Sequence, residues 1–434
     1  MITSGLSLDQ APPISVPFRF FLAAPFFGMM GCVFFFFSGA ESFHSRWGAL
    51  VLSFTHLVGL GFLMSIVIGA LFQILPVLVG SPVRQVKWVA QIIFWCQLVG
   101  TLSLSYALAT SDWSWARYLV GFLIVGFFVF ALASFDSLRR ARAAHETVRG
   151  LKLAMAGLLM TMVLGLLLVL GHNGVPLALF RPELTNFHLM QAWLSWFFIL
   201  IVSVSYQIIP TFYVTQPFPK TMRVYFLPSV FALVALNLFC SLYSAAFGPV
   251  CLALIRHLMA LPVLVYGLVL LRLIHGRRRK AQDKSLRFWI TGVWLSFLAL
   301  LVWFFFGQAE VTLGVLVFSA IAAVVLGMLQ KIVPFLVWFH LQAKAQVAAK
   351  PVRVPNMSAI VSARSAAVTY WLFVVAVLNF LAASFGLPLF GQSAGFFGFF
   401  LFFSVALSVS KSWKVYLKES QKLAVSGVAG VLVS

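Results

Sequence analysis

The sequence of 434 residues contains no Gly-rich phosphate loop and no H-E-x-x-H motif, so nucleotide-driven and zincin-type chemistry are not expected. Charged residues make up only 9% of the chain, and no polar stretch is long enough to fold as a separate domain. Its 4 cysteines stand singly, without a C-x-x-C pair, and are interpreted as small apolar side chains. Only Cys240 and Cys251, near the ends of consecutive apolar stretches, leave room for a disulfide or a thiolate metal site.

Hydrophobic residues dominate instead, at 62% of the chain, and they form long continuous runs. A hydrocarbon layer about 30 Å thick requires about 20 apolar residues per spanning helix. The sequence therefore predicts an all-α integral membrane protein, with a single membrane domain over residues 1–434 and twelve transmembrane helices. The predicted spans are 17–38, 48–77, 87–109, 115–137, 151–171, 187–213, 223–246, 249–273, 287–307, 311–340, 366–387 and 391–412.

The net charge of +21 resembles that of a nucleic-acid-binding protein until the basic residues are placed along the chain. Most of the 30 Lys and Arg residues lie at the start of the first span or follow even-numbered spans, and only Arg46, Arg117 and Arg181 lie in the opposite loops. The positive-inside rule then predicts a multi-pass protein of a bacterial-type inner membrane with both termini in the cytoplasm. The basic loops are expected to contact lipid headgroups, and no nucleic-acid partner is expected. Residues 1–16 lack the basic start of a signal peptide.

A repeated motif organises the chain into three units of four spans, approximately 17–137, 151–273 and 287–412. The second span ends GALFQILPVLVG, the sixth ends VSYQIIPTFYV and the tenth ends GMLQKIVPFLVWFH. Four spans return the chain to the same side of the membrane, so the repeats are parallel rather than inverted. The residues aligned on the three prolines (Pro76, Pro210 and Pro334) are Gln73, Gln207 and, in the third copy, Gln330 with Lys331.

These glutamines have two interpretations. A proline frees a carbonyl one turn earlier, and a nearby glutamine can bond that group or a neighbouring helix, which is ordinary helix packing. Alternatively, Gln73, Gln207, Gln330 and Lys331 line a polar path, as in a permease, since an intramembrane lysine usually faces a cavity or a partner. Lys331 is also close enough to the cytoplasmic end of its span to snorkel to the surface.

Histidines gather near the outer ends of the spans. His56 and His188 precede their repeat prolines by about the same distance, about 30 Å along the helix, whereas the third repeat has Thr312 and Gly314 there. His257 follows Arg256 in the eighth span, which also enters from outside. Each histidine alone is explained by an interfacial hydrogen bond, but the shared depth indicates a haem or metal site.

At this point the chain resembles the catalytic subunit of haem-copper oxidases, which has twelve helices in three pseudo-symmetric groups of four. Locally, PFRFFLAAPFF at 17–27 followed by HLVGLGFLMSIVIGALFQILPVLVG is similar to the NnrS-like haem membrane proteins linked to nitric oxide tolerance. The resemblance implies a b-type haem, with His56, His188 and His257 as candidate iron ligands. Arg256 and Arg181 are then the expected partners of the haem propionates.

The sequence also departs from the oxidase pattern. The seventh span has no histidine, the tenth has none in its outer half, and the residue four after His188 is Ala192 rather than tyrosine. Copper and a dioxygen-reducing centre are therefore not expected. The second ligand would come from elsewhere, and His257 is the candidate opposite His56 or His188.

The sequence thus favours an oxidase-like haem protein without a copper site. Its function would be nitric oxide handling or electron transfer. Two other classes stay open: a permease with the glutamine-lined path, and a non-catalytic subunit of a respiratory complex with a redox partner or another membrane subunit. A five-coordinate haem would bind a small gas, whereas a six-coordinate haem would pass electrons.

Overall fold

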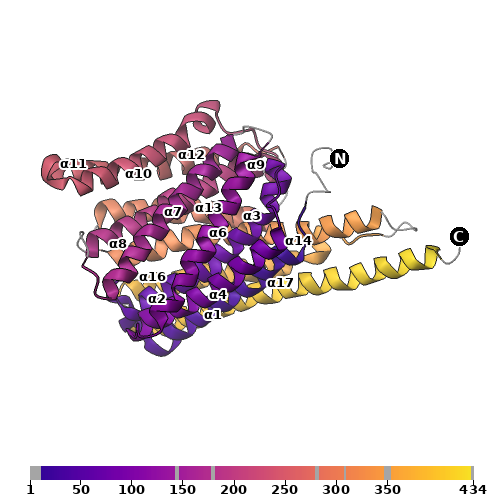
Figure 1. The fold of residues 1–434 in the computed structure, drawn as a ribbon, viewed down its shortest axis with the longest axis horizontal. Helices are drawn as coiled ribbons and strands as arrows, with labels where there is room; N and C mark the ends of the chain where they lie inside the picture. The colour runs from indigo at the N-terminus through magenta and orange to yellow at the C-terminus, as the bar shows by residue number, and fades with distance from the viewer. Residues whose placement is uncertain are drawn as a thin grey trace.

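A computed structural model describes residues 11–141, 146–176, 181–278, 283–306, 309–346 and 353–431. Within these ranges the chain is helical and contains no strand (Figure 1). The described residues form 12 helices that are long and apolar enough to cross a membrane, which confirms the predicted all-α membrane architecture. The predicted spans agree with these helices to within a few residues at most ends, although the tenth and twelfth helices continue well beyond them.

The elements are grouped here by the three predicted units of four spans. The first consists of α1 (Ser15–Ser38), η2 (Gly39–Phe43), α2 (Ala49–His56), η3 (Leu57–Leu63), α3 (Met64–Val79), α4 (Val86–Thr110), α5 (Ala116–Leu119) and α6 (Gly121–Arg139). The second consists of α7 (Glu146–His172), α8 (Arg181–Met190), η4 (Gln191–Phe198), α9 (Ile199–Tyr213), η5 (Met222–Phe226), α10 (Leu227–Leu242), α11 (Ser244–Leu258) and α12 (Ala260–His275). The third consists of α13 (Lys284–Phe305), α14 (Glu310–Gln346), α15 (Met357–Ile360), α16 (Ala363–Ser384) and α17 (Pro388–Val431).

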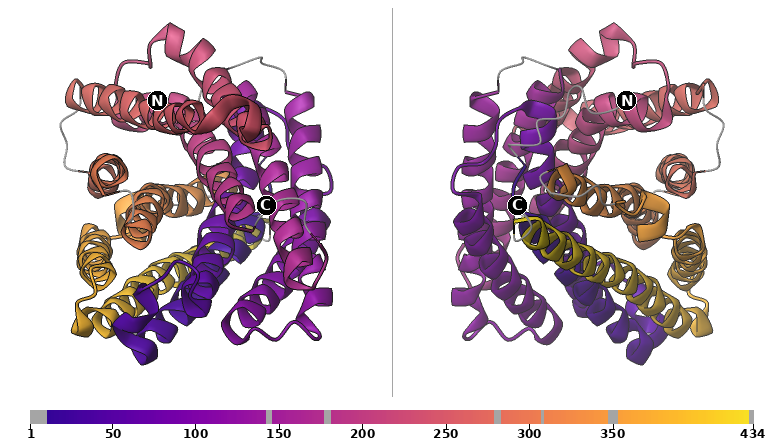
Figure 2. Two further views of the ribbon diagram at one scale, coloured as in Figure 1. Left: turned by 90° about the vertical axis from the view of Figure 1, so that its left-hand side faces the viewer. Right: turned by 90° about the vertical axis from the view of Figure 1, so that its right-hand side faces the viewer.

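The repeats are arranged as a closed ring. Helix α6 packs on α7, α12 packs on α13, and the last helix, α17, returns to lie along α1. In Figure 2 the indigo and purple first repeat, the magenta and pink second repeat and the orange and yellow third repeat occupy successive sectors. We call the side where α1 begins and α17 ends the terminus side, and the opposite side the far side.

The motif-bearing spans of the first two repeats share a break. The second span changes from α2 to a π-helical segment, η3, directly after His56, and the sixth changes from α8 to η4 shortly after His188. The tenth span, α14, is continuous α-helix through the same region. A π-helical turn widens the helix and costs hydrogen-bond geometry, and such turns occur frequently at functional sites.

The repeat prolines lie inside helices, and in two repeats they precede the helix end. Gly80 and Val214, each four residues after the proline, adopt left-handed conformations (φ 69° and 53°) that stop α3 and α9. Glycine adopts this conformation without strain, whereas β-branched valine does not. Helix α14 instead continues past Pro334 to Gln346.

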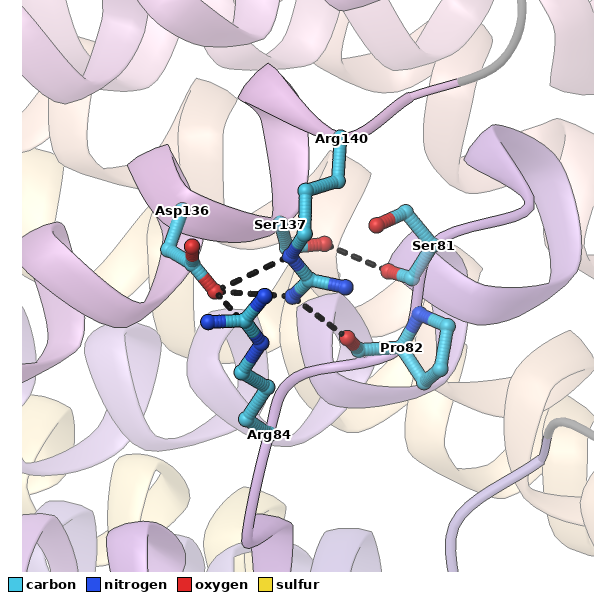
Figure 3. Close-up of polar contacts among 6 residues, drawn as sticks. All are labelled: Ser81, Pro82, Arg84, Asp136, Ser137 and Arg140. Atoms are coloured by element: carbon cyan, nitrogen blue, oxygen red, sulfur yellow. Dashed lines mark hydrogen bonds and ion pairs between the residues drawn. The ribbon is translucent and has the colours of Figure 1, made fainter.

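Basic residues on the terminus side hold the loops that follow these helix ends (Figure 3). Arg140, at the end of α6, binds the Asp136 carboxylate (2.8 Å) and donates to the Pro82 carbonyl (3.0 Å). The Ser137 hydroxyl donates to the carbonyl of Ser81. The loop after α3 is therefore attached to the end of α6, so these charges have a structural partner besides lipid headgroups.

The second repeat has an analogous attachment. Arg223 binds Glu146 at the start of α7 (3.0 Å) and donates to the Phe218 carbonyl in the loop after α9 (3.1 Å). One arginine again joins a loop to the end of a neighbouring helix. The two arginines occupy different places along the chain, since Arg140 follows α6 whereas Arg223 lies in η5.

Close packing of α7 against the sixth span depends on glycine. A Cβ built at Gly157 would lie 2.3 Å from the Ser195 carbonyl oxygen in η4, and one at Gly150 would lie 2.2 Å from the Ser203 hydroxyl. Small residues at helix interfaces let membrane helices approach closely, which substitutes for a hydrophobic driving force that lipid does not supply.

We expect Gly157→Ala to lower the stability of the protein, because the added methyl group must separate α7 from η4. Overpacking of this kind costs about 1–3 kcal/mol. Gly121→Ala is the matched control, since a Cβ there meets no described atom within 4 Å. The thermal unfolding midpoint in detergent measures both variants. Equal midpoints for the two variants would contradict the close-contact interpretation.

Candidate histidine site on the far side

His56 and His188, predicted from separate repeats, lie next to each other in the structure. Their ring centroids are 6.4 Å apart and the ring planes are inclined by only 21°. His56 ends α2 and His188 lies in the last turn of α8, so both occupy the far-side half of the bundle. Both side chains are half-buried.

Each ring is oriented by a backbone carbonyl. The Nδ1 atom of His56 lies 2.7 Å from the Leu52 carbonyl oxygen, and that of His188 lies 3.1 Å from the Thr161 carbonyl oxygen. A carbonyl only accepts, so Nδ1 carries the proton in both rings and Nε2 keeps its lone pair. Over the described ranges no residue hydrogen-bonds to either Nε2 atom. Metal-ligating histidines are held in this way, with the second nitrogen bonded to a carbonyl.

The distance between the two ring centres can be compared with that of two imidazoles bound to one metal ion. Imidazole nitrogens lie about 2 Å from a bound transition metal, so two rings on opposite sides of one ion have centres about 6 Å apart. The centroid separation of 6.4 Å is close to that spacing for an arrangement in which both Nε2 atoms point at the ion. The described residues contain no group of three or more His, Cys, Asp or Glu side chains that could hold a metal ion. A bare ion with a full protein ligand set is therefore not supported, whereas a metal that brings its own equatorial ligands needs only two axial donors.

The surroundings of the pair come from all three repeats. A Cβ at Gly59, one turn after His56, would contact the Phe318 ring at 3.7 Å, and Trp193 of η4 packs edge-on against the same ring, with centroids 5.5 Å apart. At Gly314, the third-repeat counterpart of the histidines, a Cβ would meet no described atom within 4 Å. The third repeat therefore contributes the Phe318 ring beside the span of His56, and it has Gly314 rather than histidine at the aligned position.

The π-helical segment after His56 is held by a residue that sequence reasoning missed. Buried Gln97 of α4 donates from Nε2 to the Leu60 carbonyl (2.6 Å) and to the Ser65 hydroxyl (3.0 Å). The irregular turn leaves Leu60 with an available carbonyl, and in an apolar interior such a group needs a partner. Gln97 therefore stabilises the irregular turn that follows His56.

A second missed residue, Arg46, joins the three repeats on the far side. It precedes α2, binds Glu310 at the start of α14 (2.9 Å), and donates to Asn186 of α8 (2.8 Å). Asn186 is two positions before His188, which is about 3 Å along a helix. The sequence offered one indication of this role: Arg46 is one of the few basic residues in the far-side loops.

The structure places the other predicted ligands apart from this pair. His257 is exposed on α11 and lies against Trp303 and Phe304 near the far-side end of α13, with ring centroids 6.2 and 5.3 Å away. Arg256 beside it is also exposed, and Arg181 begins α8. The structure thus brings together His56 and His188 rather than His257 with either. The ligand and propionate roles of His257, Arg256 and Arg181 stay predictions.

The repeated glutamines share one property: amide atoms without a partner. Both amide atoms of buried Gln73 and the Oε1 atoms of Gln207 and Gln330 are buried and make no hydrogen bond to a described residue. A cavity of about 20 Å³ beside Gln330 is also lined by Thr369 and Ser408, which is room for about one water molecule. Unpaired buried amides cost about 1–3 kcal/mol each, so water is expected at these positions.

Lys331 pairs with a carboxylate instead of extending alone to the surface. It forms an ion pair with Asp283, which precedes α13 and accepts hydrogen bonds from the Ser285 amide (2.9 Å) and hydroxyl (2.7 Å). The Ser285 hydroxyl also bonds Tyr213 at the end of α9 (2.8 Å). Burial acts to raise the pKa of Asp283, but hydrogen bonds from Lys331 and Ser285 outweigh it and hold that pKa below its usual range.

Comparison with known proteins does not assign the chain to a family. No protein-family model matches the chain. No curated protein matches it either. The oxidase-like and NnrS-like resemblance therefore rests on the residues described above.

We expect Gln97→Leu to destabilise the protein, because it leaves the Leu60 carbonyl without its donor, at a cost of about 1–3 kcal/mol. Gln91→Leu makes the same change on an exposed face of α4 and is the control. Thermal unfolding in detergent compares them. If the two variants unfold at the same temperature, Gln97 does not support the π-helical segment.

The Asp283–Lys331 pair predicts a pH dependence of stability. Because the folded pKa of Asp283 is depressed, its contribution is present above the ordinary aspartate pKa and is lost as pH falls through the folded value, below about 4. Asp283→Asn is expected to be less stable than the native protein at pH 7, with the difference disappearing below about pH 4. A difference in unfolding midpoint that stays constant between pH 7 and 3 would contradict this linkage.

Proposed function

We propose that this polytopic membrane protein binds a haem, with His56 and His188 as the two axial ligands. The carrying observation is the pair itself: two imidazoles from different repeats, 6.4 Å apart, nearly parallel, each with Nδ1 bonded to a carbonyl. Two imidazole rings whose centres lie at this separation suit a metal whose other ligands come from a macrocycle. The proposal agrees with the family resemblance and replaces His257 as the second ligand.

The residues of the chain support a non-covalently held, b-type group. The sequence has no C-x-x-C-H, which covalent c-type attachment uses. Gly59, one turn after His56, lies against the Phe318 ring, and Trp193 packs on the same ring, so aromatic surface lies beside the spans that carry the pair. Arg46, on the same side as the histidines, is the nearest described cation along the second span, and a propionate there would share it with Glu310.

A haem with both axial positions filled transfers electrons, and one that releases a ligand binds a small gas. The protein itself would orient both imidazoles through hydrogen bonds from Nδ1 to the carbonyls of Leu52 and Thr161, which leaves each Nε2 available to the metal. We therefore favour electron transfer, with nitric oxide handling as the outcome if one histidine dissociates. The charge distribution supports placing the terminus side in the cytoplasm of a bacterial inner membrane.

The test is an optical spectrum of the purified protein, oxidised and reduced, after expression with ample haem. We expect a Soret band in the native protein that is lost or shifted to a five-coordinate form in both His56→Ala and His188→Ala. His257→Ala is the matched control and is expected to retain the native spectrum. Size-exclusion profiles show that the variants remain folded.

A colourless native protein would contradict the proposal. Loss of colour in His257→Ala, with retention in His56→Ala, would contradict the assignment of the ligands but not the haem. These outcomes test separately whether the protein binds haem and which histidines coordinate the iron.

A second candidate is a permease, and the unpaired amides of Gln73, Gln207 and Gln330 favour it. In that case the glutamines and Lys331 line a hydrated path, although Lys331 already has Asp283 as its partner. A colourless native protein, together with water-accessible labelling of cysteines introduced at the three glutamines, would support this candidate.

A further inference from the structure

A groove opens between α1 and α4, away from the histidine pair. Its volume is about 420 Å³. Leu22, Phe26 and Met30 line it from α1, and Leu98 and Leu102 line it from α4. These helices cross the membrane, so the groove lies against the acyl chains of the bilayer.

One end of this apolar groove carries a cation. Arg19, near the start of α1, lines the groove, and its guanidinium carbon lies 5.8 Å from the centre of the Phe94 ring. Its Nη1 atom is buried and makes no hydrogen bond to a described residue, and no acidic side chain in the described ranges pairs with Arg19. An unpaired charge within a membrane span is costly and requires an anionic partner.

Further polar residues lie on α4, between the Arg19 end of the groove and the terminus side. Gln91 and Lys87 precede Phe94 at helical spacing, on the same face as Leu98, and both are exposed. A second cation and an amide therefore lie on the α4 side of the groove. Basic pockets between membrane helices near a cytoplasmic surface are suited to lipid headgroups.

The length of the groove identifies the rest of the ligand. From Arg19 to Met30 the helix rises about 16 Å, at about 1.5 Å per residue. Half of a hydrocarbon core about 30 Å thick is about 15 Å, so the groove matches one leaflet. A free phosphate would occupy the charged end alone and leave the apolar length empty.

We propose that this groove binds an anionic glycerophospholipid of the terminus-side leaflet. The phosphate pairs with Arg19, and one acyl chain lies along Leu22, Phe26 and Met30 against Leu98 and Leu102. The proposal is independent of the haem, because it uses none of the residues around His56 and His188.

The experiment is native mass spectrometry of the full chain in detergent, titrated with phosphatidylglycerol and, separately, phosphatidylcholine. We expect the native protein to bind one phosphatidylglycerol in preference to phosphatidylcholine. Arg19→Gln is expected to bind phosphatidylglycerol about tenfold more weakly and to lose the preference. Arg364→Gln removes an exposed arginine at the start of α16 and should bind as the native protein does.

Two further variants test separately the charge of Arg19 and the open space of the groove. Arg19→Lys keeps the charge and should keep the preference for phosphatidylglycerol, which also guards against misfolding as the cause of the Arg19→Gln result. Ala23→Phe fills the groove without removing the charge and should weaken the binding of both lipids. Equal binding of the two lipids by the native protein, or unchanged preference in Arg19→Gln, would overturn the proposal.

Discussion

Inside a bilayer no water is available to a backbone or side-chain polar group, so each such group needs a partner within the protein or a bound molecule. Most of this chain meets that constraint with uninterrupted α-helix and apolar side chains. Several places do not meet it. On the motif-bearing spans they include the π-helical segments η3 and η4, the Nε2 atoms of His56 and His188, and the amides of Gln73, Gln207 and Gln330. Others lie on neighbouring helices, such as the Thr101 hydroxyl of α4 and the Asn237 amide oxygen of α10.

The repeats have diverged in a consistent way. The first two combine a histidine, a π-helical segment and a helix end in the left-handed conformation four residues after proline. The third keeps the proline but has Gly314 in place of the histidine, a continuous helix and Lys331 paired with Asp283. Two of the three motif-bearing spans therefore supply a histidine, and the third does not.

Charge has two structural uses here besides setting topology. On the terminus side, Arg140 and Arg223 attach the loops that follow α3 and α9. On the far side, Arg46 joins α8 and α14 across repeats. Arg19 differs from these because its guanidinium lies beside an apolar groove without an acidic partner, which is why a lipid phosphate is its expected ligand.

Hydropathy and residue spacing alone determined the twelve helices, the recurrence of the Gln–Pro motif and the histidines worth testing, because span length, apolar periodicity and proline position are local properties of the chain. Which histidines meet was not local. His56 and His188 come from different repeats, and His257, at a comparable predicted depth, lies instead against Trp303 and Phe304. The roles of Gln97 and Arg46 likewise depend on contacts between helices that are distant in the sequence. Only tertiary packing decides such contacts, since helix rotation and the π-helical offset set the direction of each side chain.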